Sequence, residues 1–376
     1  MQFKRPMFSR RDPRFSTLLR LCIGCVLISL GGTAGAQQGA KQTVKNADAI
    51  ESWLYIEPYE VRFEALVPFT LLESLMPIPR SDESVLTIAE QEAAADTILL
   101  LFQAQTSVII DGISVQPYET KLVFFDETIT SITQDPVPSD LETRIVTVGL
   151  IYRYSLKGPA HQVSLEWMAF NPIVERVLAT VFAGEYSRRE VLVPFSSQVK
   201  WTSASGPLQG PEISASFLEV RDKTPREERT AEVTEALLRN IYRAFDYRLE
   251  EEIYDALAGS VTGDLLAEVY LDIRQGLAIQ AEGGASARVH RVDLRDGSLQ
   301  STFGRDKGFL YTASWTVWGR VEHWGHIHER QNIYTADFTV VPVGSTWRFS
   351  AMKVRQQERV DSALSVRSAP APEGFR

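Results

Sequence analysis

Cysteine is nearly absent from this sequence, since only Cys22 and Cys25 occur among 376 residues and both lie in the first 36. A chain that begins after residue 36 therefore has no disulfide and no thiol chemistry. There are only five histidines. The sequence also lacks a glycine-rich phosphate loop, a nucleophile elbow and a His-Glu-x-x-His pattern. These absences favour a non-enzymatic role and indicate no cofactor.

The first 36 residues have the layout of a signal peptide. A basic region that ends at Arg20 precedes an apolar run over residues 21–30, which is short for a membrane span. Ala34-Gly35-Ala36 then has the small-x-small pattern of a cleavage site. We expect cleavage near Ala36 and a periplasmic or secreted protein. Retention of the segment as an uncleaved anchor is the alternative.

Cleavage would make the chain strongly acidic. The residues after position 36 include 33 Lys and Arg against 47 Asp and Glu, a net charge of about −14. Such a balance disfavours nucleic acid and anionic lipid as partners. No second apolar stretch of membrane length follows, so stable membrane insertion is not expected after cleavage. The remaining partners are a protein, a small anionic ligand or further copies of the chain.

Composition and periodicity predict an α+β protein of two domains. We expect a signal peptide (1–36), a flexible lead-in (37–50), a β-rich domain (51–203), a linker (204–223), an α+β domain (224–360) and a disordered tail (361–376). Short strands with turn signals dominate the first domain, which predicts a β-sandwich with helical insertions.

Four features are expected within the β-rich domain. Residues 88–103 predict a helix, and residues 173–182 could form another short one. Asp111-Gly112 between two β-branched runs predicts a hairpin turn. Residues 191–201 are expected to form one strand. His161 follows Gly158-Pro159-Ala160 and is expected in a surface turn.

The α+β domain is expected to begin with three helices. Thr224-Pro225-Arg226-Glu227 has the residues of a helix N-terminus, and Val233, Leu237 and Ile241 recur at the spacing of a buried helical stripe. Further helices are expected over residues 249–257 and 263–282. Everything that follows has strand character, over residues 288–294, 309–341 and 347–355.

Residues 309–341 predict two long antiparallel strands joined at Trp324-Gly325. This turn places His323 opposite His326, Gly319 opposite Arg330, and Trp315 opposite Tyr334. One face is then apolar away from the turn and polar near it. The other face pairs Arg320 with Glu329 and Ser314 with Thr335, as expected of a solvated surface. A slip of one residue would destroy both patterns.

The polar part of the inner face supplies the candidate ligand-binding residues Arg330, Asn332, Tyr334 and Trp315. A guanidinium on a partly apolar wall suits a carboxylate or phosphate. An internal salt bridge of Arg330 is the other interpretation. A polar inner face also fits either a cavity whose entrance is open to solvent or the edge of a sheet that extends beyond the core.

Three histidines on the same face, His323, His326 and His328, form a candidate site for weak binding of a divalent metal. Neutral imidazole nitrogens suit zinc or copper. However, Glu322 and Glu329 point to the opposite face, so no carboxylate completes or orients the set. Cross-strand histidines packed on Trp324 are the structural alternative.

Three helices followed by a long, curling antiparallel sheet resemble the nuclear-transport-factor-two-like superfamily, a cone-shaped α+β fold. Tyr242-Arg-Ala-Phe-Asp246 and Trp347-Arg-Phe-Ser350 strengthen the resemblance, which covers residues 225–360. It implies a cavity enzyme, a ligand binder or an inert assembly module. Cavity enzymes of this superfamily often use an Asp–His pair inside the cone. Here Asp337 falls on the outer face, which disfavours the enzymatic role.

The sequence thus predicts a periplasmic or secreted, non-catalytic binding or assembly protein. The alternative is a cavity enzyme or carrier of a small anionic ligand that uses the inner sheet face of the C-terminal domain. No residue is assigned a catalytic role.

Overall fold

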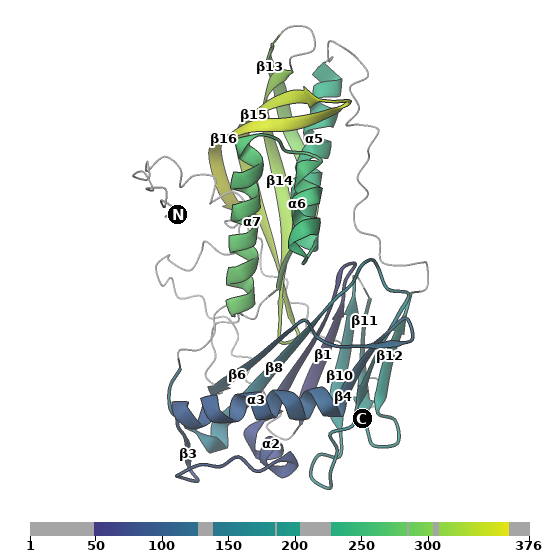
Figure 1. The fold of residues 1–376 in the computed structure, drawn as a ribbon, viewed down its shortest axis with the longest axis vertical. Coiled ribbons are helices and arrows are strands. Elements are labelled where there is room, and N and C mark those ends of the chain that lie inside the picture. Colours follow the sequence, from purple (N-terminus) through teal and green to yellow (C-terminus); the bar gives the residue numbers. More distant parts are fainter. Residues whose placement is uncertain are drawn as a thin grey trace, which may run out of the picture.

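The computed structural model describes residues 49–126, 138–184, 186–203, 227–283, 286–303 and 308–360. The expected signal peptide, most of the lead-in, the whole linker and the tail lie outside the described residues. Figure 1 shows two units arranged along the long axis of the molecule. Each unit has its own hydrophobic core. Among the described residues, no helix is long and apolar enough to cross a membrane.

The N-terminal unit is a β-sandwich with helices beside it (Figure 1). Its larger sheet has the order β11 (Tyr186–Leu192), β10 (Val177–Ala183), β1 (Ile50–Ile56), β2 (Glu60–Pro68), β8 (Val146–Ser155) and β6 (Glu119–Asp126). The smaller sheet has the order β12 (Gln198–Thr202), β9 (Gln162–Trp167), β4 (Thr106–Ile110) and β5 (Ile113–Val115). The remaining elements are α2 (Phe69–Leu75), β3 (Val85–Leu86), α3 (Ile88–Gln105), β7 (Leu141–Glu142) and the 3-10 turn η2 (Thr143–Ile145).

Aromatic side chains fill the space between the two sheets. Trp167 of β9 packs 5.5 Å from Phe102 of α3 and 6.3 Å from Phe63 of β2, measured between ring centroids. The expected helix over residues 88–103 is confirmed and begins with a capping box in which Thr87 and Glu90 bond reciprocally. The Asp111-Gly112 turn is confirmed, and His161 is exposed as expected.

Two expectations for this unit are wrong. Residues 173–182 do not form a helix, because Val177–Ala183 is strand β10, which pairs parallel with β1. Its central position buries both faces and removes the alternation that identifies a strand. Residues 191–201 are not one strand, because Val193 and Ser196 close a tight turn between β11 and β12. Helix α2 was not expected from the sequence.

The C-terminal unit packs three helices on a four-stranded antiparallel sheet. The helices are α5 (Glu227–Arg243), α6 (Glu250–Ala258) and α7 (Asp264–Gly283), with the 3-10 turn η3 (Ala244–Asp246) after α5. The strands are β13 (Ser286–Thr302), β14 (Phe309–His323), β15 (His326–Val343) and β16 (Thr346–Val360), in that order across the sheet. The buried stripe expected on α5 is confirmed, since Val233, Leu237 and Ile241 are at most 3% exposed.

The hairpin register is confirmed along its whole length. His323 pairs with His326, Gly319 with Arg330, and Trp315 with Tyr334. Arg320 and Glu329 form the expected pair at 3.6 Å. The outer face is not solvated along its whole length. Glu322 and Ile327 next to the turn are buried, and so is Thr316 farther from it, which corrects the expectation of a solvated surface along the whole hairpin.

Candidate interdomain site

The outer face of the hairpin is buried near its turn because this end docks on the larger sheet of the N-terminal unit. Trp324 and Gly325 both have positive φ, 45° and 77°, as a two-residue type I′ turn requires. The backbone nitrogen of Trp324 donates to Glu64 Oε2 at 2.7 Å, and that of Gly325 donates to Tyr55 Oη at 2.8 Å. The two amide groups at the hairpin tip are therefore satisfied by the other unit.

Close apolar packing surrounds this tip. A Cβ on Gly325 would lie 2.2 Å from Nε1 of Trp53, and a Cβ on Gly149 would lie 2.6 Å from the Trp324 ring. The apolar cluster at the tip joins both units and contains Trp53, Tyr55, Leu66, Phe125, Phe182 and Ile327. Tryptophan is rare in such a turn because positive φ disfavours bulky residues. Here the contacts with Phe125 and Gly149 explain its presence.

Beside the tip, a buried arginine links charges from both units. Arg62 of β2 is 1% exposed, and its Nε donates to Glu64 Oε1 at 2.8 Å. Its Nη2 reaches Glu322 of β14 at 3.4 Å, and its guanidinium lies 4.2 Å from the centre of the Tyr55 ring. Burial raises the pKa of Glu64, although Arg62 and the Trp324 amide oppose the shift. Burying the charged side chains of Arg62 and Glu64 costs free energy, which their hydrogen bonds and opposite charges must offset.

A second buried carboxylate, Glu60, is the centre of the seam between the units. It accepts hydrogen bonds from Arg248 at 3.1 Å, Arg288 at 2.7 Å and the hydroxyl of Tyr118 at 2.8 Å, and Arg153 lies 3.4 Å away. Burial alone would raise its pKa. Arg248, Arg153 and Arg62 overcome that effect and hold the pKa at about 2. Glu60 is therefore ionised throughout the physiological range.

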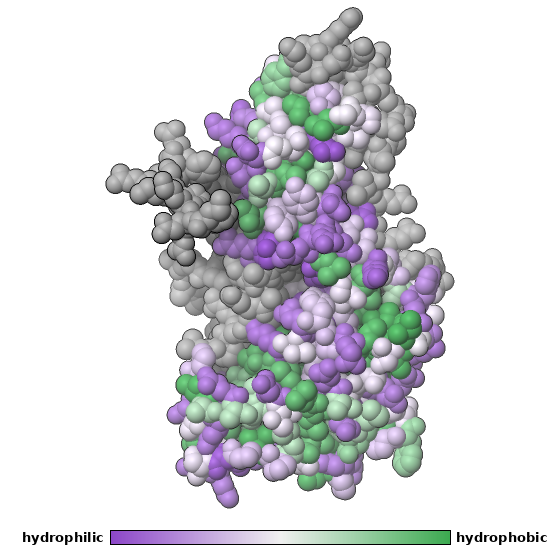
Figure 2. Space-filling view, viewed as in Figure 1, coloured by the Kyte–Doolittle hydropathy of each residue, from purple (hydrophilic) through white to green (hydrophobic). Residues whose placement is uncertain are grey.

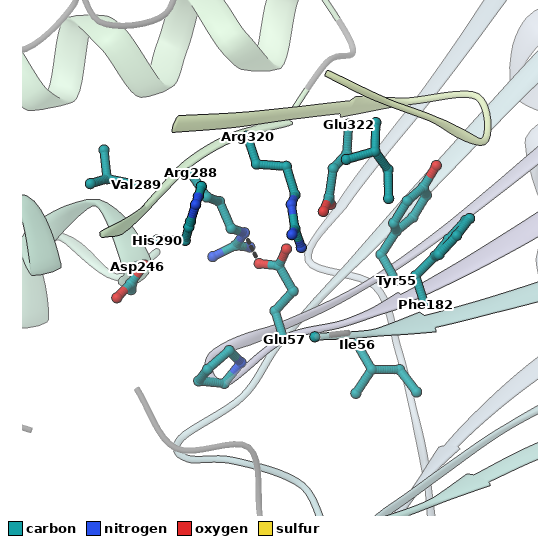
Figure 3. Close-up of a pocket in the computed structure, with 13 residues that line it drawn as sticks. Tyr55, Ile56, Glu57, Phe182, Asp246, Arg288, Val289, His290, Arg320 and Glu322 are labelled. Atoms are coloured by element: carbon teal, nitrogen blue, oxygen red, sulfur yellow. Dashed lines mark ion pairs between the residues drawn. The ribbon is translucent and has the colours of Figure 1, made fainter. Parts of the chain in front are cut away.

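A pocket of about 230 Å³ opens between the units beside this network (Figure 3). Its charged lining includes Arg288, Arg320, Glu57, Glu322 and Asp246. Figure 3 shows Arg288 paired with Glu57, while Asp246 lies apart from that pair. Hydrophilic residues also gather on the surface around the level where the two units meet (Figure 2). The pocket thus combines these charged groups with apolar walls from Tyr55, Phe182 and Ile327.

Two polar groups in this pocket, Arg288 and Asp246, are buried without partners that fully offset the cost of burial. The Nη1 of Arg288 has no hydrogen-bond partner among the described residues, although Nη2 bonds to Glu60. Burial lowers the pKa of Arg288 to about 10. Burial also raises the pKa of Asp246 to about 6, against the opposing effect of Arg248 and Arg243. The pocket therefore offers one available donor and one carboxyl group that titrates near neutrality.

The candidate ligand-binding residues lie elsewhere, within the C-terminal core. Trp315 and Tyr334 are fully buried, and their rings stack at 5.4 Å. The Nε1 of Trp315 lies 3.3 Å from the Tyr242 hydroxyl on α5. Asn332 is 4% exposed. Arg330 lies opposite Gly319 as expected, but its side chain is outside the described part, so its role stays a prediction.

The histidine trio also stays a prediction. His323 is buried with its ring 4.7 Å from that of Trp324, which agrees with the structural alternative. The side chains of His326 and His328 lie outside the described part. Among the side chains that are described, no group of three His, Cys, Asp or Glu could hold a metal ion.

Sequence reasoning missed the seam entirely. Glu60, Arg62 and Glu64 alternate with apolar residues, which is the ordinary pattern of a strand with one solvated face. In the structure β2 is buried on both faces, because the hairpin tip covers the charged one. Leu66 continues the charged row as an apolar residue and was a local sign that this face is covered.

Comparisons with known proteins give little further information. No protein-family model and no curated protein matches the chain. Among solved structures, the intermembrane space region of the chloroplast protein ARC6 aligns with 18% identity. The alignment covers 35% of this chain and 98% of that one, with a TM-score of 0.23. A score this low supports no argument about function.

Proposed function

We propose that this chain is a periplasmic or secreted binding or assembly protein without a catalytic site in its cone-like domain. The observation that carries the proposal is the filled interior of the C-terminal unit. Trp315, Tyr334 and Phe338 lie on the side of the sheet that packs against the helices, with essentially no exposure, and the Tyr242 hydroxyl of α5 lies 3.3 Å from Trp315 Nε1. Side chains therefore fill the space in which a cavity enzyme of this fold would hold a substrate.

The docked hairpin supports an assembly role. A hairpin tip that inserts into a sheet face, with its amides satisfied by Glu64 and Tyr55, couples the two units through specific contacts. The surfaces of the two units that face away from this junction then remain available to bind a partner. The superfamily resemblance includes inert assembly modules, which agrees with this function. Membership of that superfamily is part of the proposal.

The proposal predicts that Trp315 is a core residue and not a wall of an open chamber. Replacing it with alanine should lower the free energy of unfolding by about 3–5 kcal/mol. Urea unfolding measures this loss, with Leu271→Ala on α7 as the exposed control, since Leu271 is 62% exposed. An unchanged stability of Trp315→Ala would mean that the interior is open.

Site-specific photo-crosslinking in intact cells tests the binding role itself. A photoreactive residue at exposed positions of either unit should give discrete adducts with another protein or with a second copy. The same residue in place of the buried Phe338 should give none. If no exposed position forms an adduct, the protein-binding role is wrong.

The second candidate function is carriage of a small anion, and the pocket between the units favours it. Arg288 Nη1 is buried there without a hydrogen-bond partner among the described residues, so an anionic oxygen would satisfy it. Phosphate, acetate and citrate should then raise the melting temperature of the wild type but not that of Arg288→Met. Equal effects on both proteins would exclude this function.

A further inference from the structure

Two neighbouring turns at the end of the sandwich far from the C-terminal unit have the same unusual composition. They are Asn171-Pro172-Ile173-Val174 and Val193-Pro194-Phe195-Ser196. Each has proline at its second position and a large apolar residue at its third. Ile173 is 65% exposed, and Phe195 is fully exposed at 102%. Such positions commonly hold Gly, Asn, Asp or Ser.

Both turns are held rigidly. Val193 and Ser196 exchange backbone hydrogen bonds at 3.1 and 2.9 Å. The other turn is closed by Asn171 N to Val174 O at 3.2 Å, and Asn171 Oδ1 accepts from the amides of Ile173 and Val174. The Asn171 side chain also donates to Ser74 O of α2 at 2.7 Å. The two apolar side chains are therefore presented in fixed positions.

The pairing of the strands places these turns next to each other. Val177 at the start of β10 pairs with Leu192 at the end of β11, so the turn before β10 and the turn after β11 lie at the same edge. Met168 joins them, since the adjacent Trp167 donates its backbone N–H to Ser197 O at 2.8 Å. Met168 is 46% exposed. Met168, Ile173 and Phe195 together form what we call the apolar end.

The start of β1 lies at this same end. Ile50, its first residue, pairs with Val177, and Val177 pairs with Leu192. Ala49, the first described residue, therefore lies at the same edge of the sandwich as the apolar end. The chain before Ala49 includes the apolar run 21–30 and its basic flank, which tether the chain to a membrane until cleavage near Ala36 if they act as the expected signal peptide.

We propose that the apolar end docks on the surface of a neutral lipid bilayer. Protruding Phe, Ile and Met side chains can enter the boundary between headgroups and acyl chains, as the apolar face of an interfacial helix does. Glu175 and Arg176 are exposed beside the turns with opposite charges. The acidic chain gives no attraction to anionic lipid. This binding is peripheral and reversible, and it agrees with the expectation that the processed chain has no stable insertion.

Flotation with phosphatidylcholine vesicles tests the proposal on the exported protein, with removal of residues 1–36 verified by intact mass. The wild type should float with the vesicles. Ile173→Ser combined with Phe195→Ser should lower the partition coefficient at least about tenfold, because two apolar side chains no longer leave water. Phe195→Leu should retain binding. Added phosphatidylglycerol should not strengthen it.

Ile113→Ser is the matched control. Ile113 is 68% exposed in the same unit but at the opposite end, since Ile110 pairs with Val163 and Thr106 with Trp167. This variant should float as the wild type does. Failure of the wild type to float would overturn the proposal and leave a protein partner for the apolar end. Equal flotation of the double Ser variant, or flotation only with anionic lipid, would overturn it as well.

Discussion

The hydroxyl of Tyr55 on β1 accepts a hydrogen bond from the backbone nitrogen of Gly325 at the tip of the β14–β15 hairpin, at 2.8 Å. These residues are 270 positions apart in the sequence. Their contact fixes one end of a seam in which Glu60, Arg62 and Glu64 meet Arg248, Arg288 and Glu322.

Gly325→Ala should destabilise the protein more than Gly344→Ala does. Both glycines have positive φ, 77° and 61°, so alanine costs about 1–2 kcal/mol of backbone strain at either position. At Gly325 the added Cβ would also lie 2.2 Å from Trp53, whereas nothing lies within 4 Å at Gly344. Urea unfolding should show an additional loss of roughly 1–3 kcal/mol at Gly325. Equal losses would show that the tip is not tightly docked.

Asp246 should make stability fall as pH rises. Burial raises the pKa of its carboxyl from 3.8 to about 6, so ionisation is more costly in the folded protein. Its stabilising contribution is complete below about pH 4 and is lost as pH rises through 6, a change of roughly 3 kcal/mol. Asp246→Asn should remove this slope and be more stable than the wild type at pH 8.

Asp255→Asn is the control for that measurement, because Asp255 is exposed on α6 and the substitution changes the charge equally. Its profile of unfolding free energy against pH should run parallel to that of the wild type. A profile of Asp246→Asn that also runs parallel would show that Asp246 does not titrate in a buried environment.

Zinc should bind the protein no tighter than micromolar. The candidate site offers only three histidine ligands and no carboxylate ligand, and the His323 ring is buried against Trp324. Calorimetric titration of the metal-free protein should show weak heats that the double variant His326→Ala/His328→Ala abolishes. Nanomolar affinity that disappears in this variant would establish the trio as a functional metal site.

The exported protein should begin near Gln37. The basic region, the short apolar run and Ala34-Gly35-Ala36 predict cleavage at that point. Cell fractionation followed by intact-mass analysis checks both the location and the new N-terminus. A full-length product that remains in the membrane would support the uncleaved anchor instead.

The sequence predicted the parts of the fold that depend on local patterns. The register of the hairpin could be read pair by pair, because alternation and the Trp324-Gly325 turn both constrain it. Strand β10 could not be read, since its Ala-Thr-Val-Phe core is buried on both faces and resembles a helix segment as much as a strand. Interior strands of this kind carry no periodic signal.

The site was harder to predict than the fold. Glu60 forms its contacts with residues 58 to 228 positions away, and its partners Arg248 and Arg288 could be identified only once the two units were placed together. Trp315 and Tyr334 were correctly placed on the inner face. Whether they line a cavity or fill the core depends on how closely α5 approaches, and in the structure the Tyr242 hydroxyl of α5 lies 3.3 Å from Trp315 Nε1. The hairpin pattern contains no information about this helix.

Calorimetric unfolding of the wild type beside Glu60→Gln tests the central claim, that the seam couples both units into one cooperative body. The substitution removes the buried carboxylate that Arg153, Arg248 and Arg288 share, which should cost about 3–5 kcal/mol. Glu51→Gln is the control, since Glu51 pairs with Arg189 within the N-terminal unit. We predict one transition for the wild type and the control, with equal calorimetric and van't Hoff enthalpies, and two separate transitions for Glu60→Gln. Two transitions in the wild type, unchanged by Glu60→Gln, would contradict the account.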